Sequence, residues 1–428
     1  MIQVAIILST GNELTSGRTV DTNANFIADR LGAIGVEVAA VMTVGDVSER
    51  LRWAWETAIE RADLVISTGG LGPTSDDLTT ETVAQVTGRK LWQSAPVLEA
   101  IRERFARSGR QMPPNNAKQA LFPEGALIIP NELGTAPGFR LEVERRGGGK
   151  AHLVTLPGVP REMKRMMEAT VLPWVGQARG HDKVFATRVF QTFGISESAL
   201  DEAVSGLIAP GEGRVAFRAS FPQISLRIVV EASPAEAERR VEELAGRVRQ
   251  RVGQFVFAED DATMEEVVAR LLAERRLKLA LAESCTGGLI SHRLTNVPGS
   301  SRFHLGSFVT YANELKQTVL GVRAKTLAEH GAVSEPCVRE MVAGALERSQ
   351  ADLALAVSGI AGPDGGTPDR PVGTVWFALA AGPSLVARRY QLQGTRDWIK
   401  LVASQVGLDW LRRYALGAPV IEAAAFRR

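Results

Sequence analysis

Residues 279–296, LALAESCTGGLISHRLTN, decide the fold of the last part of this 428-residue chain. The apolar run from Leu277 to Ala282 predicts a buried strand, and the apolar residues after Gly287-Gly288 recur at helical spacing. Ser284 is therefore expected on the turn between a strand and a helix. At such a turn the hydroxyl is exposed, and free backbone N–H groups can stabilise an oxyanion.

A serine becomes a useful nucleophile only when a base takes its proton. The nearest candidates are Tyr311 and Lys316, on the next turn from strand to helix, which suggests a Ser/Lys pair with a tyrosine as relay. The simpler alternative is that Ser284 only caps the helix, because serine is a common N-cap residue. The local pattern leaves both interpretations open.

Four motifs in order carry a resemblance to a known family: ESCTGG at 283–288, FVTYANELK at 308–316, GAVSE at 331–335 and SGIAGPDGGTPDRPVGTVWFA at 358–378. Residues 263–416 resemble the C-terminal domain of the CinA (competence/damage-inducible protein A) family and are similar to nicotinamide mononucleotide deamidases. The resemblance implies hydrolysis of nicotinamide mononucleotide to nicotinate mononucleotide and ammonia, without a cofactor. It also implies that Ser284 is the nucleophile, Lys316 its general base and Tyr311 a helper in proton transfer.

The loop at 359–373 follows an apolar strand and contains five glycines and three prolines. This composition predicts a stiffened loop with backbone donors, where the phosphate of the substrate would sit; a plain hairpin loop is the alternative. Arg396, in the first turn of the last helix, either pairs with a neighbouring carboxylate or meets the substrate. The substrate-binding residues expected in this domain are Thr286, Gly287, Ser358, Gly359, Gly362, Gly365, Gly366 and Arg396.

The N-terminal residues alternate apolar strands with helical patterns, from the first strand in MIQVAIILST to a strand at 63–68. This alternation predicts a doubly wound α/β domain with its site at the carboxyl ends of the strands. Glycines at 69–72 leave room for an anion beside the backbone, and Asp76 and Asp77 are hard-oxygen ligands suited to a divalent cation. Asp46, after an earlier strand, is expected to face the same crevice. Alternatively, Asp76 or Asp77 is only a helix cap.

Five segments of this region carry a second resemblance: STGNEL, GRTVDTN, TGGLGPTSDD, NELGTAPG and LPGVPREM. Residues 2–170 are similar to the molybdopterin-binding-type domain that opens CinA proteins. The resemblance implies a metal-dependent ADP-ribose pyrophosphatase that uses Mg²⁺, Mn²⁺ or Co²⁺. The residues that it assigns to pyrophosphate and metal are Gly69, Gly70, Gly72, Thr74, Asp76 and Asp77, with Asn23, Asn131 and Gly134 nearby.

Between these regions, residues 184–252 predict a β-α-β-β-α unit similar in outline to a KH fold. It lacks a GxxG clamp, and its nine arginines are offset by nine acidic residues, so nucleic-acid binding is not expected. RRGGGK at 145–150 reads as a hairpin inside the first domain. The expected domains are a molybdopterin-binding-like domain at 1–176, a KH-like α+β domain at 184–255 and a CinA-type α/β amidase domain at 259–417.

Composition narrows the class of protein. A formal net charge of +2 gives no general attraction to nucleic acid or anionic lipid, and no apolar run approaches the ~18 residues of a membrane span. Cys285 and Cys337 are too few for a disulfide framework or a structural zinc site, and a buried apolar role is expected for Cys285. A soluble cytoplasmic protein is predicted, and the family resemblance implies a homodimer.

Two classes of function follow. The first is a bifunctional hydrolase of pyridine-nucleotide recycling, acting on nicotinamide mononucleotide and ADP-ribose. The second is a non-catalytic adaptor in competence or the DNA-damage response. A serine, a tyrosine and a lysine kept together favour the enzyme, because an adaptor has no use for a nucleophile beside its base.

Overall fold

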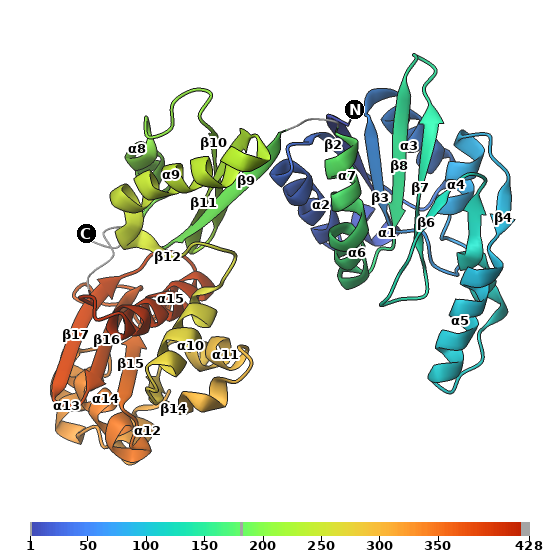
Figure 1. Ribbon diagram of the computed structural model, residues 1–428. Helices are drawn as coiled ribbons and strands as arrows, with labels where there is room; N and C mark the ends of the chain where they lie inside the picture. Colours follow the sequence, from blue (N-terminus) through green and yellow to red (C-terminus); the bar gives the residue numbers. More distant parts are fainter. Residues whose placement is uncertain (1, 180–182, 421–428) are drawn as a thin grey trace. The chain divides into compact units, whose positions relative to one another are not determined.

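The computed structural model describes residues 2–179 and 183–420 (Figure 1). The described residues form two compact units. The first runs to Ala186 and includes Glu231–Ala237, and the second comprises Thr187–Val230 and the chain from Glu238 onward. No helix in these ranges combines the length and the apolar character needed to cross a bilayer.

The N-terminal domain is built on a six-stranded sheet with the order β2-β1-β3-β8-β7-β6. Its strands are β1 (Val4–Thr10), β2 (Glu37–Val44), β3 (Leu64–Thr68), β6 (Leu127–Ile129), β7 (Gly138–Glu144) and β8 (Lys150–Leu156). Its helices are α1 (Asn12–Thr15), α2 (Thr22–Ala33), α3 (Ser48–Arg61), α4 (Thr79–Val86), α5 (Ala95–Arg107), α6 (Pro160–Met166) and α7 (Leu172–Ala178). Two short strands, β4 (Leu91–Gln93) and β5 (Leu121–Pro123), pair separately.

Four of these strands, β2, β1, β3 and β8, run parallel to one another. β2 and β3 lie on opposite sides of β1, so the strand order reverses at β1. Such a reversal opens a crevice at the carboxyl ends of the strands. The predicted doubly wound domain is thus confirmed. β1 is an uninterrupted apolar run because helices cover both faces: Ile6 belongs to one core cluster and Ile7 to the other. Residues 145–149 form the predicted hairpin between β7 and β8.

The middle domain has the predicted β-α-β-β-α order. A four-stranded sheet with the order β10-β11-β9-β12 contains β9 (Val184–Thr192), β10 (Arg214–Ser220), β11 (Gln223–Ala232) and β12 (Val256–Ala258). Its helices are α8 (Glu197–Val204) and α9 (Pro234–Val252). Ser196 caps α8 by accepting a hydrogen bond from the N–H of Ala199, as its sequence position suggests.

The C-terminal domain is built on a five-stranded sheet with the order β14-β13-β15-β16-β17. Its strands are β13 (Leu279–Glu283), β14 (His304–Val309), β15 (Leu353–Gly359), β16 (Thr374–Ala381) and β17 (Ser384–Gln391). Its helices are α10 (Met264–Glu274), α11 (Leu289–Thr295), α12 (Asn313–Leu320), α13 (Ala324–His330), α14 (Glu335–Ser349) and α15 (Arg396–Ala415). β14, β13 and β15 are parallel, and β16 and β17 continue the sheet antiparallel.

The LALA pattern of β13 sorts side chains between the two faces of this sheet. Leu279 and Leu281 pack in the core cluster that α10 and α15 share. Ala282 packs on the opposite face, in the cluster formed with α14. Small side chains on that face suit a close approach of the helix, whereas leucines fill the wider space under the other layer. The alternation therefore fixes which face of β13 each helix covers.

Candidate functional site

Three parallel strands bring the predicted C-terminal site residues to one edge of the sheet. β13 ends at Glu283, and its neighbours β14 and β15 end at Val309 and Gly359. Because the carboxyl ends of neighbouring parallel strands lie side by side, the turns that follow them must converge. Ser284 follows β13, and Lys316 lies in the first turns of α12, shortly after β14.

Ser284 and Lys316 are in direct contact. Lys316 Nζ lies 3.1 Å from Ser284 Oγ, and it also donates to the carbonyl oxygens of Thr310 at 2.8 Å and Tyr311 at 3.0 Å. The side chains are shielded from water, since Lys316 is 1% and Ser284 7% exposed. The pair predicted from residues 32 positions apart is present as a hydrogen-bonded unit.

Burial also sets the protonation of this lysine. Desolvation lowers the pKa of Lys316 from its ordinary value of 10.5, while Cys337, Cys285 and Glu314 oppose the shift. A neutral amine has two N–H groups and one lone pair. If the two carbonyls accept the two N–H groups, the lone pair faces Ser284 and can take the proton of its hydroxyl. The geometry therefore suits a general base.

Glu283 holds the turn on which Ser284 lies. Its side chain is fully buried and accepts hydrogen bonds from Thr286 Oγ1 at 2.7 Å, the N–H of Ile290 at 3.1 Å and the N–H of Ser291 at 2.9 Å. The N-cap of α11 is Gly288, with φ +91°, so Ser284 does not cap this helix. The Glu283 carboxylate therefore occupies two of the first N–H groups of α11, which are not free to bind an oxyanion.

Glu283 was not among the residues predicted from sequence. The sequence feature that could have identified Glu283 is its position: it is a carboxylate at the end of an apolar strand, next to the candidate nucleophile. Such a residue must be buried, and a buried carboxylate needs hydrogen-bond donors nearby.

Tyr311 and Arg396 lie together beside the predicted loop. Arg396 donates to the hydroxyl of Tyr311 and to the carbonyl oxygen of Gly362, each at 2.7 Å. The Tyr311 phenol thus contacts Arg396, while only its backbone oxygen contacts Lys316. Its predicted part in proton transfer stays a prediction. The arginine joins the turn after β14, the 359–373 loop and the start of α15.

The remaining predicted residues of this domain belong to the end of β15 and to the 359–373 loop. Ser358 is buried and donates to the carbonyl oxygen of Ala332 at 2.8 Å. A Cβ at Gly359 would lie 3.1 Å from Cys285 Sγ, so the loop begins against the Ser284 turn. Gly362 and Gly365 have φ of +79° and +87°, and Gly366 approaches the backbone of Val372 too closely for a side chain. The loop also closes the antiparallel connection from β15 to β16, so the hairpin interpretation holds as well.

Cys285 follows Ser284 in the turn, and Lys400 approaches the turn from α15. Burial raises the pKa of the Cys285 thiol to about 12, which keeps it protonated at neutral pH and agrees with the buried apolar role expected for it. Lys400, which the sequence reasoning missed, extends from α15 toward the same turn. A Cβ at Gly287 would lie 4.0 Å from its Nζ, which places a positive charge beside the turn.

The N-terminal crevice holds a cavity of about 440 Å³. Five carboxylate side chains line it together with the glycine-rich turn after β3; they belong to Glu13, Asp46, Asp76, Asp77 and Glu162. Gly69, Gly70 and Gly72 also lie on the wall, as predicted. Any side chain at these glycines would collide with Thr10, Thr79 or Asp77. Glu13 and Glu162 were not predicted, because nothing in the local sequence shows that they face this crevice.

Some predicted residues shape this crevice without lining the cavity. Asn23 donates to Thr68 Oγ1 at 3.0 Å and to the carbonyl oxygen of Gly158 at 2.8 Å. Asn131 accepts from the N–H of Gly134 and donates to Glu162 at 2.7 Å. These amides tie the strand ends and the 131–138 loop into place.

The two aspartates of the glycine-rich turn do not cap α4. That helix begins at Thr79 without a side-chain cap. Asp77 instead accepts from the N–H of Thr74 at 2.8 Å and from its hydroxyl, so Thr74 shapes the turn. Asp76 lies on the same cavity wall, and its interaction with the Thr74 hydroxyl lowers the pKa of its carboxyl group.

The carboxylates of this cavity suit a divalent cation in their charge, but they are not arranged around one metal position. Desolvation raises the pKa of Asp46, and the nearby negative charges of Glu13, Asp76 and Asp77 raise it further. A cation would relieve that repulsion. Within residues 2–179 and 183–420, however, no three His, Cys, Asp or Glu side chains are preset around one metal position. A cation bound here would therefore need further oxygens from water or from a phosphate.

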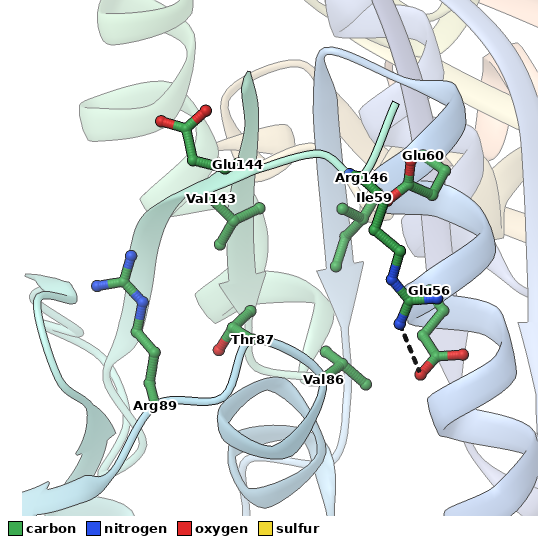
Figure 2. Close-up of a pocket in the computed structure, with 9 residues that line it drawn as sticks. All are labelled: Glu56, Ile59, Glu60, Val86, Thr87, Arg89, Val143, Glu144 and Arg146. Atoms are coloured by element: carbon green, nitrogen blue, oxygen red, sulfur yellow. Dashed lines mark hydrogen bonds and ion pairs between the residues drawn. The ribbon is translucent and has the colours of Figure 1, made fainter. Parts of the chain in front are cut away.

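A second cavity, of about 280 Å³, is lined by residues of α3, of α4 and the chain after it, and of the β7–β8 hairpin (Figure 2). Its charged groups already have protein partners. Arg146 faces Glu56 at 3.8 Å, Glu60 accepts from two backbone N–H groups, and Arg89 donates to two backbone carbonyls. The crevice at the carboxyl ends is thus the better candidate site of the N-terminal domain.

Comparison with known proteins agrees with this division into three domains. The family profile described as a probable molybdopterin binding domain matches residues 6–177, the damage-inducible protein CinA KH domain matches 187–258, and the CinA C-terminal domain matches 261–415.

Similar proteins extend along nearly the whole chain. A putative competence-damage inducible protein of Symbiobacterium thermophilum is 43% identical over 97% of this chain and 99% of its own. A CinA-like protein of Citrifermentans bemidjiense is 46% identical over 96% and 97%. A solved CinA superfamily protein from Klebsiella pneumoniae is 38% identical and covers 36% of this chain and 99% of its own, with a TM-score of 0.35.

The Glu283 network generates a prediction about stability. Glu283→Gln replaces one acceptor oxygen by an NH₂ group that faces backbone donors, so we expect it to destabilise the domain by roughly 2 kcal/mol. Glu347→Gln, on the exposed face of α14, should change stability by less than about 0.5 kcal/mol. Thermal unfolding of both variants measures the difference. Equal unfolding midpoints would show that the three hydrogen bonds to Glu283 contribute nothing.

Proposed function

The chain belongs to the CinA family, and on that premise we propose that its C-terminal domain hydrolyses the carboxamide of nicotinamide mononucleotide, giving nicotinate mononucleotide and ammonia. The observation that carries the proposal is the buried contact of 3.1 Å between Lys316 Nζ and Ser284 Oγ. A serine held by a lysine whose pKa is lowered is the minimum apparatus for attack on an amide carbon.

The proposed reaction has two halves. Ser284 Oγ bonds to the amide carbon while Lys316 takes the hydroxyl proton, and Lys316 then returns that proton to the departing nitrogen, which leaves as ammonia. Water next attacks the acyl ester, with Lys316 again as base, and Ser284 is released together with the carboxylate product. The nitrogen therefore leaves in the first half, and one water molecule is consumed in the second.

Positive charge around the turn supports a substrate that carries phosphate. Arg396 contacts the 359–373 loop, and Lys400 approaches Gly287. The substrate is anionic through its phosphate, so these two side chains and the backbone donors of the loop are its proposed binding groups. Thr286 and Ser358 shape the floor of the site, since each already holds a hydrogen bond within the domain.

The nucleophile assignment gives a direct test. In Ser284→Ala, release of ammonia from nicotinamide mononucleotide should fall by at least about a thousandfold, because no other group in the site replaces the hydroxyl. The matched control is Ser301→Ala, an exposed serine, which should retain full activity. Ammonia is measured by a coupled assay, and the unfolding midpoint confirms that both variants fold. Undiminished release by Ser284→Ala would remove the proposed nucleophile.

The lowered pKa of Lys316 predicts a pH dependence. Only the neutral amine accepts a proton, so kcat should rise with pH through the pKa of Lys316, which lies below 10.5, and then level off. kcat is the informative constant, because the free substrate's phosphate also titrates. Lys316→Arg should be inactive throughout, since a guanidinium stays protonated. A kcat that is independent of pH from about 5 to 10 would contradict the base role.

For the N-terminal domain we propose a metal-dependent cleavage of ADP-ribose to AMP and ribose 5-phosphate. The supporting observation is one cavity that combines carboxylates with a glycine-rich turn. Asp46, Asp76 and Asp77 would hold the cation, and the backbone at Gly69–Gly72 would lie against the diphosphate. When bound, the cation would neutralise charge on the diphosphate, which is the main requirement of such a hydrolysis.

This second activity is tested with ADP-ribose in the presence of Mg²⁺, Mn²⁺ or Co²⁺. Asp76→Ala and Asp77→Ala should each lower AMP formation by more than about tenfold. Glu124→Gln, an exposed carboxylate of the same domain, serves as the control and should leave the rate unchanged. Absence of AMP with all three metals, or full activity of both aspartate variants, would refute the assignment.

A further inference from the structure

The hairpin of the middle domain reaches the helix that carries Arg396. Its tip lies between β10 and β11, and the ring of Phe221 stacks on that of Trp398, with ring centroids 4.0 Å apart and planes inclined by 26°. Gln405 Nε2 also donates to Gln223 Oε1, at 3.4 Å. Trp398 and Gln405 are seven residues apart in α15, so they lie on one face of the helix, two turns apart. The hairpin tip thus spans the first half of α15.

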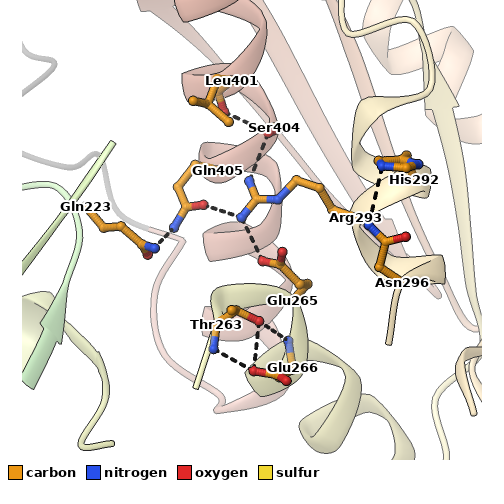
Figure 3. Close-up of polar contacts among 10 residues, drawn as sticks. All are labelled: Gln223, Thr263, Glu265, Glu266, His292, Arg293, Asn296, Leu401, Ser404 and Gln405. Carbon is orange, nitrogen blue, oxygen red and sulfur yellow. Dashed lines mark hydrogen bonds and ion pairs between the residues drawn. The ribbon is translucent and has the colours of Figure 1, made fainter. Parts of the chain in front are cut away.

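The contact at Gln405 is anchored in the C-terminal domain (Figure 3). Gln405 is fully buried, and its Oε1 accepts from Arg293 at 2.6 Å. Arg293 also donates to Glu265 at 2.7 Å and to Ser404 at 2.9 Å. Arg293 belongs to α11, the helix that follows the Ser284 turn. A continuous set of hydrogen bonds therefore joins α10, α11 and α15 to the hairpin.

The start of α15 is held by Arg396, which donates to Tyr311 and Gly362, and by Ile399, which is buried in the core. The first N–H groups of any helix lack partners within the helix, and the N-cap Thr395 makes no side-chain hydrogen bond to them. A helix end of this kind frays easily. Trp398 lies in this first turn, two residues after Arg396, and half of its surface is exposed despite the contact with Phe221. The stacked pair is therefore a further restraint on the turn, and it is the one that the middle domain supplies.

That turn faces the proposed substrate site. Arg396 contacts Tyr311 and Gly362, and Lys400, one turn further on, approaches Gly287. A shift of the turn would move both positive charges relative to the loop. Ser284 and Lys316 would stay in place, because they are held by β13, Glu283 and α12.

We propose that the hairpin tip of the middle domain, Phe221 and Gln223, is a positioning element of the amidase site. By restraining the first turns of α15, it sets Arg396 and Lys400 for the anionic part of the substrate. The inference rests on the proposed function of the C-terminal domain. Phe221 is a positioning residue, since it acts through Trp398 and touches none of the reacting groups.

The test uses the full chain and separates binding from chemistry. Phe221→Ala should raise KM for nicotinamide mononucleotide by about three- to tenfold, the scale of a lost aromatic pair, with kcat within about twofold of the original. Phe221→Tyr keeps the ring and should restore the original KM. Adding Trp398→Ala to Phe221→Ala should raise KM little further, because the two residues act as one pair.

Arg218→Ala, on the exposed side of β10, is the matched control and should leave both constants unchanged. A KM for Phe221→Ala equal to that of the unaltered, active protein would overturn the inference.

Amide hydrogen exchange provides a readout that does not need activity. In Phe221→Ala the amides at 399–402, the first that donate within α15, should exchange faster, while those of α14 keep their rates. If the unaltered protein releases no ammonia, the proposed function fails. The exchange rates then decide the hairpin's role separately: faster exchange at 399–402 supports it, and unchanged exchange overturns it.

Discussion

The burial of one lysine amine is the constraint on which the C-terminal domain depends. Lys316 Nζ is removed from water and surrounded by a hydroxyl and two backbone carbonyls. An ammonium in such a position is costly, whereas a neutral amine satisfies all three neighbours. The carbonyls of Thr310 and Tyr311 are available because the chain turns directly after β14, before α12 begins. The fold thus creates the proposed base by geometry and by a desolvation that outweighs the opposing charge of Glu314.

Glu283 complements Lys316 on the other side of Ser284. Both side chains are buried, but the carboxylate is stabilised by three donors from the turn and the start of α11. It therefore fixes the backbone that presents the hydroxyl, while Lys316 fixes the hydroxyl itself. Because β13 is clamped between its parallel neighbours, the positions of these three side chains follow from the sheet and need no support from outside the domain.

The two candidate sites share a location in the fold and differ in charge. Each lies at the carboxyl ends of parallel strands, beside turns rich in glycine. The N-terminal cavity is lined by carboxylates, which suits an anion only when a cation lies between them. The C-terminal site has Arg396 and Lys400 near its turn, which suits an anion directly. The proposed substrates carry phosphate groups, which would bind through a cation at the N-terminal site and directly to positive side chains at the C-terminal site.

The sequence by itself determined the order of strands and helices and the doubly wound first domain. It also predicted the turn at Ser284 and the pairing with Lys316, because periodicity and glycine punctuation are local properties and the motifs are distinctive. Only the tertiary structure decided that Gly288 caps α11, that Glu283 holds the turn, and that Tyr311 meets Arg396. It also placed Glu13, Glu162 and Lys400 at the sites, and Phe221 against Trp398. The reason is physical: each of these contacts joins side chains whose direction depends on the packing of separate elements, and spacing along the chain does not encode that direction.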